Sequence, residues 1–290
     1  MTDINVLIIS CFFGKSKVNI NEAPQKNCVF FSNNENLRPI AENKGWKFIK
    51  VNLPLEDDYI ECSLQSKYVK FLKFLNDFPQ FKEFSKILYY DQKIHLKNEH
   101  VINLLIELDK NKNCNIVIRN HDQNWGVYEE AGFASQQERY KKHMKETLEF
   151  VDSRLNKDGF TKESKVQLTG VILYNNYNDI LPLTNEVYNT CMSLKQPECQ
   201  IIWTVLSQKY IDKIKIVDYY YVNPERKDNE DINDAFTGSI NKSASPFFGY
   251  VNIEGIFSIF FIFVLISLCV IMAFYIKKTN PVSFMKKLRK

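Results

Sequence analysis

An aspartate and a lysine stand where a short apolar run of the chain ends. Residues 85–96 read SKILYYDQKIHL, and this β-prone stretch delivers the carboxylate of Asp91 and the ammonium of Lys93 at its end. In open α/β sheets, ligands bind outside the carboxyl ends of strands. We therefore expect a diphosphate-bearing substrate at this point, and Asp91 is the residue that most needs an explanation.

A second group of polar and aromatic residues occupies positions 119–131, which read RNHDQNWGVYEEA. The pattern predicts a strand that runs into a turn rich in Asn, Asp and Gly, followed by a helix that carries Glu129 and Glu130. Such a turn can hold a sugar, with the indole of Trp125 against its apolar face and the carboxylates accepting protons from its hydroxyl groups. The alternative interpretation is a capped turn without a ligand.

Several other chemistries lack their motifs. The sequence Gly14-Lys15-Ser16 follows a predicted strand, but a phosphate-binding P-loop also needs glycine at position 9, where Ile9 stands. The chain has no G-x-S-x-G elbow of a serine hydrolase. Its four histidines lack zinc-hydrolase spacing, and its seven cysteines occur singly, which argues against a structural zinc site. We interpret Cys11, at a strand end, as ordinary core.

Three lysines recur at helical spacing along a helix predicted at 66–78. Lys67, Lys70 and Lys73 stand opposite its apolar side chains in that prediction. Such a stripe usually forms a solvated face; the alternative is that it meets a phosphate group or an anionic membrane surface.

The elements that would position these residues alternate between strand-like and helix-like patterns. With 290 residues, 45% hydrophobic and 25% charged, the chain can form one large α/β domain or two small ones. Strands alternating with helices predict a mainly parallel sheet covered on both faces. We predict strands at 4–10, 28–32, 46–51, 86–90, 115–119 and 166–174, and helices at 66–78, 98–109 and 136–155.

The C-terminal part of the chain differs in composition. Residues 223–254 predict a polar tether, residues 255–276 carry no charge and are long enough for a transmembrane helix, and residues 277–290 form a basic tail. The alternative for 255–276 is a buried core helix. Since the start of the chain lacks a signal-peptide pattern, we expect a domain at 1–222 anchored as a single-pass protein by its C-terminus. We place that domain in the cytosol, although the basic tail favours the lumenal orientation.

The positive charge of the chain is local. The formal net charge of +4 depends on six basic residues of the tail, without which 32 basic residues face 34 acidic ones. These six are Lys277, Lys278, Lys286, Lys287, Arg289 and Lys290. A protein that binds nucleic acid normally carries a basic face on its domain, so we expect no nucleic-acid partner.

From about position 5 to position 210 the chain resembles the glycosyltransferase-like family named after plant turgor-regulation and seed-mucilage proteins. The segments that carry the resemblance are, in order, CVFFSNN, SKYVKFL, ILYYDQKIHL, RNHDQNWGVYEEA, LTGVILYNN and PECQIIWTVLSQKY. The YYDQKI strand end and the YEEA turn are the most specific of them.

The resemblance implies a GT-A-like fold, in which a nucleotide-sugar donor binds over a Rossmann-type sheet with flanking helices. In typical members of that fold a DxD motif chelates a divalent metal that stabilises the departing diphosphate. Here the motif is Asp91-Gln92-Lys93, with one carboxylate and one ammonium. Asp91 would then hold Mn²⁺ or Mg²⁺, or the ribose, while Lys93 meets the phosphate as a point charge.

The same resemblance implies roles for other residues. Arg119, His121 and Glu130 would line the donor or acceptor pocket, and the strand around Gly170 would close one side of it. Gln200 and Trp203 correspond to a late helix in which many glycosyltransferases carry an acidic residue just before the glutamine. In this chain that position is Cys199, and the neighbouring Glu198 is either a substitute or a carboxylate that stabilises the helix N-terminus.

These observations together predict a membrane-anchored glycosyltransferase that moves a hexose or similar sugar to a glycan, lipid or protein acceptor. Asp91 and Lys93 would support the leaving diphosphate, and Glu130 or Glu129 would position or deprotonate the acceptor hydroxyl. Two alternatives are a catalytically inactive, membrane-tethered protein that binds carbohydrate or acts as a scaffold, and a hydrolase of membrane lipid. Inversion or retention of configuration is open.

Overall fold

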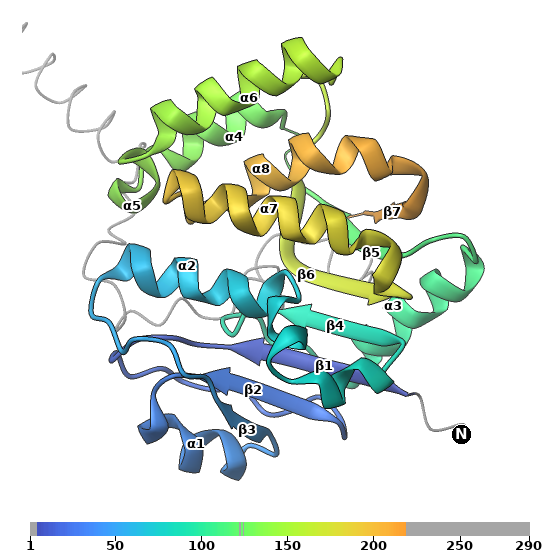
Figure 1. Cartoon of the computed structure of the whole chain (residues 1–290). Coiled ribbons are helices and arrows are strands. Elements are labelled where there is room, and N and C mark those ends of the chain that lie inside the picture. Colours follow the sequence, from blue (N-terminus) through green and yellow to red (C-terminus); the bar gives the residue numbers. More distant parts are fainter. Residues whose placement is uncertain (1–4, 122, 124, 219–290) are drawn as a thin grey trace, which may run out of the picture. The chain divides into compact units, whose positions relative to one another are not determined.

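The computed structural model describes residues 5–121, 123 and 125–218, which all lie within one compact unit of the chain (Figure 1). The predicted tether, transmembrane helix and basic tail at 223–290 lie outside these residues. Among the helices that the structure describes, none is both long and apolar enough to span a bilayer.

A single mixed sheet forms the centre of the described unit. Its seven strands are β1 (Val6–Cys11), β2 (Cys28–Ser32), β3 (Lys47–Lys50), β4 (Lys86–Tyr90), β5 (Ile116–Asn120), β6 (Gln167–Asn175) and β7 (Ile214–Val217). They lie in the order β3-β2-β1-β4-β6-β5-β7, and every neighbouring pair is parallel except the two that contain β6. The predicted α/β class with a mainly parallel sheet is therefore confirmed, with β6 as the antiparallel exception.

The strands form because short apolar runs are buried on both faces. All residues of β1 and β2 are buried, which is the pattern of strands covered on two sides. The six predicted strands are confirmed to within two residues at each end. The prediction missed β7, which is a strand of only four residues, IKIV, buried at its first and last positions.

Helices cover both faces of the sheet (Figure 1). The helices α2, α7 and α8 pack on one face, α1 and α3 pack on the other, and α4 and α6 pack against α8 in a smaller third cluster. Their bounds are α1 (Arg38–Asn43), α2 (Tyr59–Lys70), α3 (Asn98–Lys110), α4 (Val127–Ala134), α5 (Glu138–Lys141), α6 (Met144–Asp158), α7 (Leu181–Leu194) and α8 (Cys199–Leu206). Short 3-10 turns occupy Glu35–Leu37, Lys73–Asn76, Pro79–Glu83, Tyr177–Ile180 and Ser207–Lys213.

The predicted helix at 66–78 is wrong in its bounds. Helix α2 begins earlier, because Asp58 accepts hydrogen bonds from the backbone N–H groups of Ile60 and Glu61, at 2.8 and 2.9 Å. It ends at Lys70, and Leu72 has a left-handed conformation with φ of 60°. As a consequence, Lys67 and Lys70 are buried rather than on the solvated face that the prediction gave them.

The predicted helix at 136–155 is divided into two. Helix α5 ends at Lys141, and α6 begins only at Met144, because His143 between them has a non-helical backbone with φ of −119° and ψ of 18°. The helix predicted at 98–109 is confirmed as α3.

The strand ends at which a ligand would be expected lie along one side of the sheet. The carboxyl ends of the parallel strands meet there, and so does the first part of β6, because β6 runs the opposite way. The strand order reverses between β1 and β4, since the chain passes from β1 outward to β2 and β3 before it returns as β4. Ligands of open α/β sheets bind at such a switch point, and Asp91 follows β4 there.

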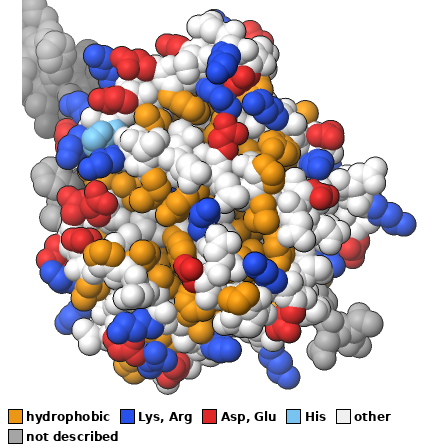
Figure 2. Space-filling model, viewed as in Figure 1, with side chains coloured by type: hydrophobic (Ala, Val, Ile, Leu, Met, Phe, Trp, Pro, Cys, Tyr) orange, Lys and Arg blue, Asp and Glu red, His pale blue; other side chains and the backbone are white. Residues whose placement is uncertain are grey.

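Charges of both signs are interspersed on the face of the molecule in Figure 2, with apolar side chains exposed between them. This face therefore carries no continuous basic stripe of the kind that tracks a polyanion.

Candidate functional site

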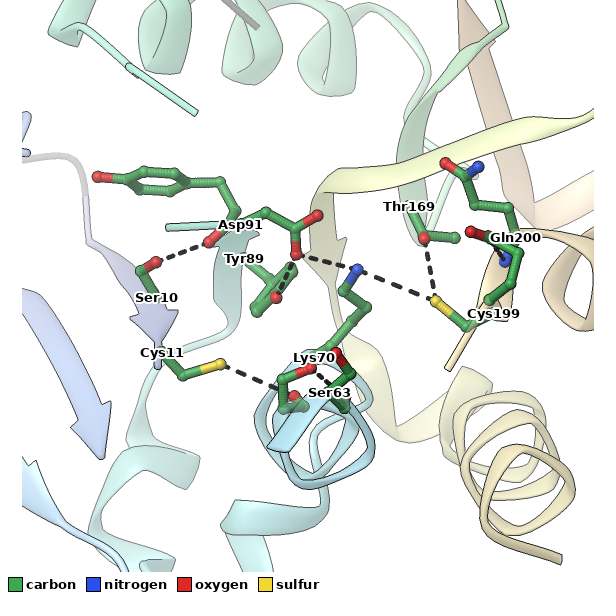
Figure 3. Close-up of polar contacts among 12 residues, drawn as sticks. Ser10, Cys11, Ser63, Lys70, Tyr89, Asp91, Thr169, Cys199 and Gln200 are labelled. Carbon is green, nitrogen blue, oxygen red and sulfur yellow. Dashed lines mark hydrogen bonds and ion pairs between the residues drawn. The ribbon is translucent and has the colours of Figure 1, made fainter. Parts of the chain in front are cut away.

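Asp91 is held from three sides at the end of β4. Its backbone N–H donates to the carbonyl of Gly170 on β6, at 2.8 Å. Its Oδ1 accepts a hydrogen bond from the hydroxyl of Tyr89, at 2.6 Å, and pairs with Nζ of Lys70, at 3.0 Å (Figure 3). Oδ2 takes no hydrogen bond from the described residues, and 26% of the side chain is exposed. One carboxylate oxygen is thus fixed, and the other is available to a ligand.

Gly170 allows β6 to lie against this carboxylate. A Cβ atom at position 170 would lie 3.3 Å from Oδ2 of Asp91 and 3.1 Å from Cδ1 of Ile94. Both separations are tighter than ordinary van der Waals contact. The structure therefore places Gly170 beside Asp91. Any larger residue at position 170 would crowd the carboxylate.

Lys70 is the residue of this site that the sequence prediction missed. Its side chain is only 4% exposed, and its Nζ lies 3.0 Å from Asp91 Oδ1, 3.9 Å from Sγ of Cys199 and 5.2 Å from the ring centroid of Tyr89. Burial by itself would lower the pKa of Lys70, but the charge of Asp91, its hydrogen bond and the acidic groups of Cys199 and Glu198 together raise the pKa above its usual value. Lys70 is therefore a charged ammonium inside the protein.

The pKa of Asp91 responds in the opposite sense. Burial would raise it, whereas the charges of Lys70 and Lys93 and the hydrogen bond from Tyr89 together bring it below its ordinary value. Asp91 and Lys70 consequently form an ion pair that is charged on both sides at neutral pH.

Lys93 stands at the mouth of the same cluster. Its side chain is exposed, and the loop that carries it is fixed by two features. The N–H of Ile94 donates to the carbonyl of Asp91 at 2.8 Å, and the amide of Asn21 donates to the carbonyls of Gln92 and Ile94 at 3.3 and 3.1 Å. Asp91 and Lys93 thus both lie at this strand end, and each charge influences the pKa of the other.

Glu130 forms the centre of a second cluster. It lies buried in the first turn of α4, and its Oε1 accepts a hydrogen bond from Nε2 of Gln200 at 2.9 Å. Its Oε2 has no hydrogen-bond partner among the described residues, and Nε2 of His121 lies 3.8 Å from it. Burial raises the pKa of Glu130 to about 7, the charge of Glu198 adds to the rise, and the bond from Gln200 opposes it. A carboxyl group with this pKa exchanges its proton near neutral pH.

Aromatic rings lie beside Glu130. The rings of His121 and Trp125 stack, with centroids 4.7 Å apart and planes 18° apart, and Trp125 also contacts the exposed Phe133 at 5.0 Å. The two acidic residues of this helix differ in direction. Glu129 is exposed, with its carboxylate turned back toward Gly126, so that Glu130 is the member that faces the cluster. Arg119 is buried at the end of β5, where the register with β6 shifts.

The N-terminus of α8 connects the two clusters. Glu198 caps the helix by accepting a hydrogen bond from the N–H of Gln200 at 3.0 Å, so the capping interpretation of this residue is confirmed. Cys199 contacts Lys70, and also Oγ1 of Thr169 at 3.3 Å, on the Asp91 side (Figure 3). Gln200 holds Glu130 on the other side. Two consecutive residues, Cys199 and Gln200, therefore contact one cluster each.

Trp203 does not lie in this site, which corrects the prediction that it binds the donor or the acceptor. It is fully buried, its indole N–H donates to Oε1 of Gln167 at 2.8 Å, and its ring stacks on Phe71 at 6.0 Å. Trp203 packs in the apolar cluster between α8 and the sheet. Cys11 is core as predicted, and burial raises the pKa of its thiol to about 12.

Asp91 is the residue that the sequence names as a ligand of Mn²⁺ or Mg²⁺, and its Oδ2 is the oxygen that such a cation could contact. Such cations prefer several oxygen ligands, including carboxylates. No three His, Cys, Asp or Glu side chains come together as metal ligands in the part of the chain that the structure describes. An ammonium also lies 3.0 Å from one Asp91 oxygen, where it would repel a second cation.

No family model matches the chain, and no curated protein matches it in sequence. Some solved structures are similar. The apo form of mouse xyloside xylosyltransferase 1 has a TM-score of 0.39 and 13% identity, over 73% of this chain and 84% of that one. A glycosyltransferase involved in the glycosylation of the major capsid of PBCV-1 has a TM-score of 0.41 and 12% identity, over 80% of this chain and 91% of that one. Glucosyl-3-phosphoglycerate synthase from Mycobacterium tuberculosis has a TM-score of 0.39 and 10% identity, over 73% of this chain and 69% of that one.

Proposed function

We propose that this chain is a glycosyltransferase of GT-A type that uses a nucleotide-diphosphate sugar as donor. The observation that carries the proposal is that the start of α8 links two different carboxyl groups, Asp91 through Lys70 and Cys199, and Glu130 through Gln200. Asp91 is charged and partly exposed at the switch point of the sheet, and Glu130 is buried with a pKa of about 7. One group suits a permanent binding role and the other suits proton transfer.

The donor side is the edge of the sheet beside Asp91. The available Oδ2 of Asp91 can accept hydrogen bonds from the hydroxyl groups of a ribose, and the exposed ammonium of Lys93 can contact the diphosphate. As the bond from the anomeric carbon to the diphosphate breaks, its electron pair leaves with the diphosphate oxygen. A fixed positive charge at that point stabilises the leaving group in the transition state.

The acceptor side is the cluster around Glu130. In its ionised form Glu130 takes the proton from the acceptor hydroxyl through Oε2, while the hydroxyl oxygen forms the new bond to the anomeric carbon. Gln200 fixes the other oxygen of the carboxylate, so that the base has a defined direction. His121, 3.8 Å from Oε2, can hold the acceptor hydroxyl or carry the charge that balances Glu130.

The sugar type transferred is proposed as a hexose, and the acceptor as a glycan, lipid or protein. The sequence-predicted transmembrane helix at 255–276 would tether the enzyme to a membrane. These finer parts of the proposal rest on the sequence.

The proposal is tested by nucleotide-sugar turnover with the full-length protein. Release of nucleoside diphosphate is measured with UDP-, GDP-, ADP- and dTDP-sugars for the wild type and for Asp91→Asn. Asp179→Asn is the matched control, because Asp179 is exposed on a different part of the chain, after β6. We expect turnover that Asp91→Asn lowers by about 10²- to 10³-fold and that the control leaves unchanged.

Two other results would change the conclusion. Donor binding without turnover would favour the inactive carbohydrate-binding protein. A folded protein that neither binds nor cleaves any donor would reject the glycosyltransferase.

A further inference from the structure

Lys70 is unusual among the basic residues of the site because it is buried. A buried ammonium is costly unless a partner of opposite charge lies within hydrogen-bond distance. Asp91 Oδ1 provides that partner at 3.0 Å, and the Tyr89 hydroxyl completes the shell of the same oxygen at 2.6 Å. Cys199 and the face of the Tyr89 ring, at 3.9 and 5.2 Å, are the other groups around Nζ. The ion pair is therefore part of the fold, and Lys70 is the counter-ion of Asp91.

Cations outnumber anions among the charged groups that shift the pKa values of Asp91, Lys70 and Lys93. Six charged groups act electrostatically on Asp91, Lys70 or Lys93, or are themselves members of that set: Lys67, Lys70, Lys93, Arg139, Asp91 and Glu198. Four of them are cations and two are anions. Of the two anions, Asp91 is paired with Lys70, and Glu198 is buried and uses its Oε1 to cap α8.

A nucleoside diphosphate carries two to three negative charges, and in a two-carboxylate site a divalent metal must neutralise both the protein and the ligand. Here the protein already supplies more positive than negative charge, and Lys93 is exposed where a ligand would enter. We propose that Lys70 acts as the built-in cation of the site, which neutralises Asp91 from within and lets the donor diphosphate bind without a divalent metal. In this arrangement Lys93 contacts the phosphate, and Lys70 is a positioning residue. This inference rests on the proposed function.

The test measures nucleotide binding, which does not depend on turnover. UDP, GDP, ADP and dTDP are titrated into the full-length protein by calorimetry, once with excess EDTA and once with saturating MnCl₂. We expect at least one of them to bind with a Kd that differs by less than about twofold between the two conditions. Lys93→Met should weaken that binding by about 10-fold or more in both conditions, as for the loss of one charge-assisted contact.

The variant Lys70→Met separates this inference from a general need for positive charge. Without the internal ammonium, Asp91 becomes an unpaired carboxylate that attracts Mn²⁺. Nucleotide binding should then be weak in EDTA and recover in MnCl₂. Lys73→Met is the control, since Lys73 follows α2 but pairs with Asn185 instead, at 2.9 Å, and it should behave as the wild type does.

The outcomes are distinct. Binding by the wild type only in MnCl₂ would overturn the inference and leave the glycosyltransferase proposal intact, whereas no binding of any nucleotide in either condition counts against the proposed function itself. If Lys70→Met does not fold, as judged by its melting curve, the comparison of EDTA with MnCl₂ in the wild type and in Lys93→Met still decides the question.

Discussion

The Asp91 cluster and the Glu130 cluster each contain a largely enclosed carboxyl group, and they treat it in opposite ways. Asp91 has Lys70 at 3.0 Å, and its pKa is lowered despite burial. Glu130 has an amide, a distant imidazole and a second carboxylate as neighbours, and its pKa rises to about 7. Burial raises the pKa of both groups, and their partners decide which group stays ionised and which one exchanges a proton.

The largest expected effect is the loss of kcat when Glu130 is replaced. Glu130→Gln keeps the shape and the contact with Gln200 but cannot accept a proton, so kcat should fall by about 10²- to 10⁴-fold. The donor KM should change little, because the Asp91 side is untouched. The matched control is Glu129→Gln, which alters the exposed neighbour. Equal losses in the two variants would show that Glu130 is not the base.

The pH dependence of kcat, which reports on Glu130, should differ from that of the donor KM, which reports on Asp91. Glu130 works as a base only when ionised, so kcat should fall about 10-fold for each pH unit below 7. The donor KM should stay flat between pH 5 and 7, because the lowered pKa of Asp91 keeps that carboxylate charged throughout. Steady-state kinetics across this range give both values. A donor KM that rises as kcat falls would contradict the assignment of kcat and KM to different carboxyl groups.

Gly170→Ala should disturb the donor side alone. The added Cβ would lie 3.3 Å from Asp91 Oδ2 and 3.1 Å from Ile94 Cδ1, so the donor KM should rise and stability should drop by about 1–3 kcal/mol. Gly132→Ala is the control, since its Cβ would meet no atom within 4 Å. Donor kinetics and a thermal melt for both variants check this, and an unchanged donor KM in Gly170→Ala would show that the close approach has no role in binding.

Cys199→Ser should have the smallest effect. A hydroxyl can keep contacts with both Lys70 and Thr169 in place of the thiol, and the net cost of such an exchange is about 1 kcal/mol or less. Activity should remain within a few-fold of the wild type. A loss as large as that of Glu130→Gln would assign Cys199 a direct chemical role.

The sequence was informative wherever a site residue directly follows or lies on a strand. Asp91 and Gly170 meet because strand ends and strand pairing follow from apolar runs, which local patterns reveal. Lys70 was placed on the wrong face because its burial depends on where α2 begins and ends. A local signal for the start existed, since Asp58 followed by Glu61 is the spacing of a capping box. The left-handed turn at Leu72 had no such signal, because leucine rarely adopts it.

The reversed direction of β6 has a consequence for how such a protein can change. The chain leaves the sheet after β5 and returns to the same edge at the start of β6, and the two ends of this excursion are tied by the bonds His121 N–H to Val166 O, at 3.0 Å, and Val166 N–H to Trp125 O, at 2.8 Å. Helices α4, α5 and α6 thus form an insertion between β5 and β6 whose two ends are hydrogen-bonded to each other. A change of length far from these two ends leaves the pairing of β6 with β4 and β5, and with it the position of Gly170 beside Asp91, in place.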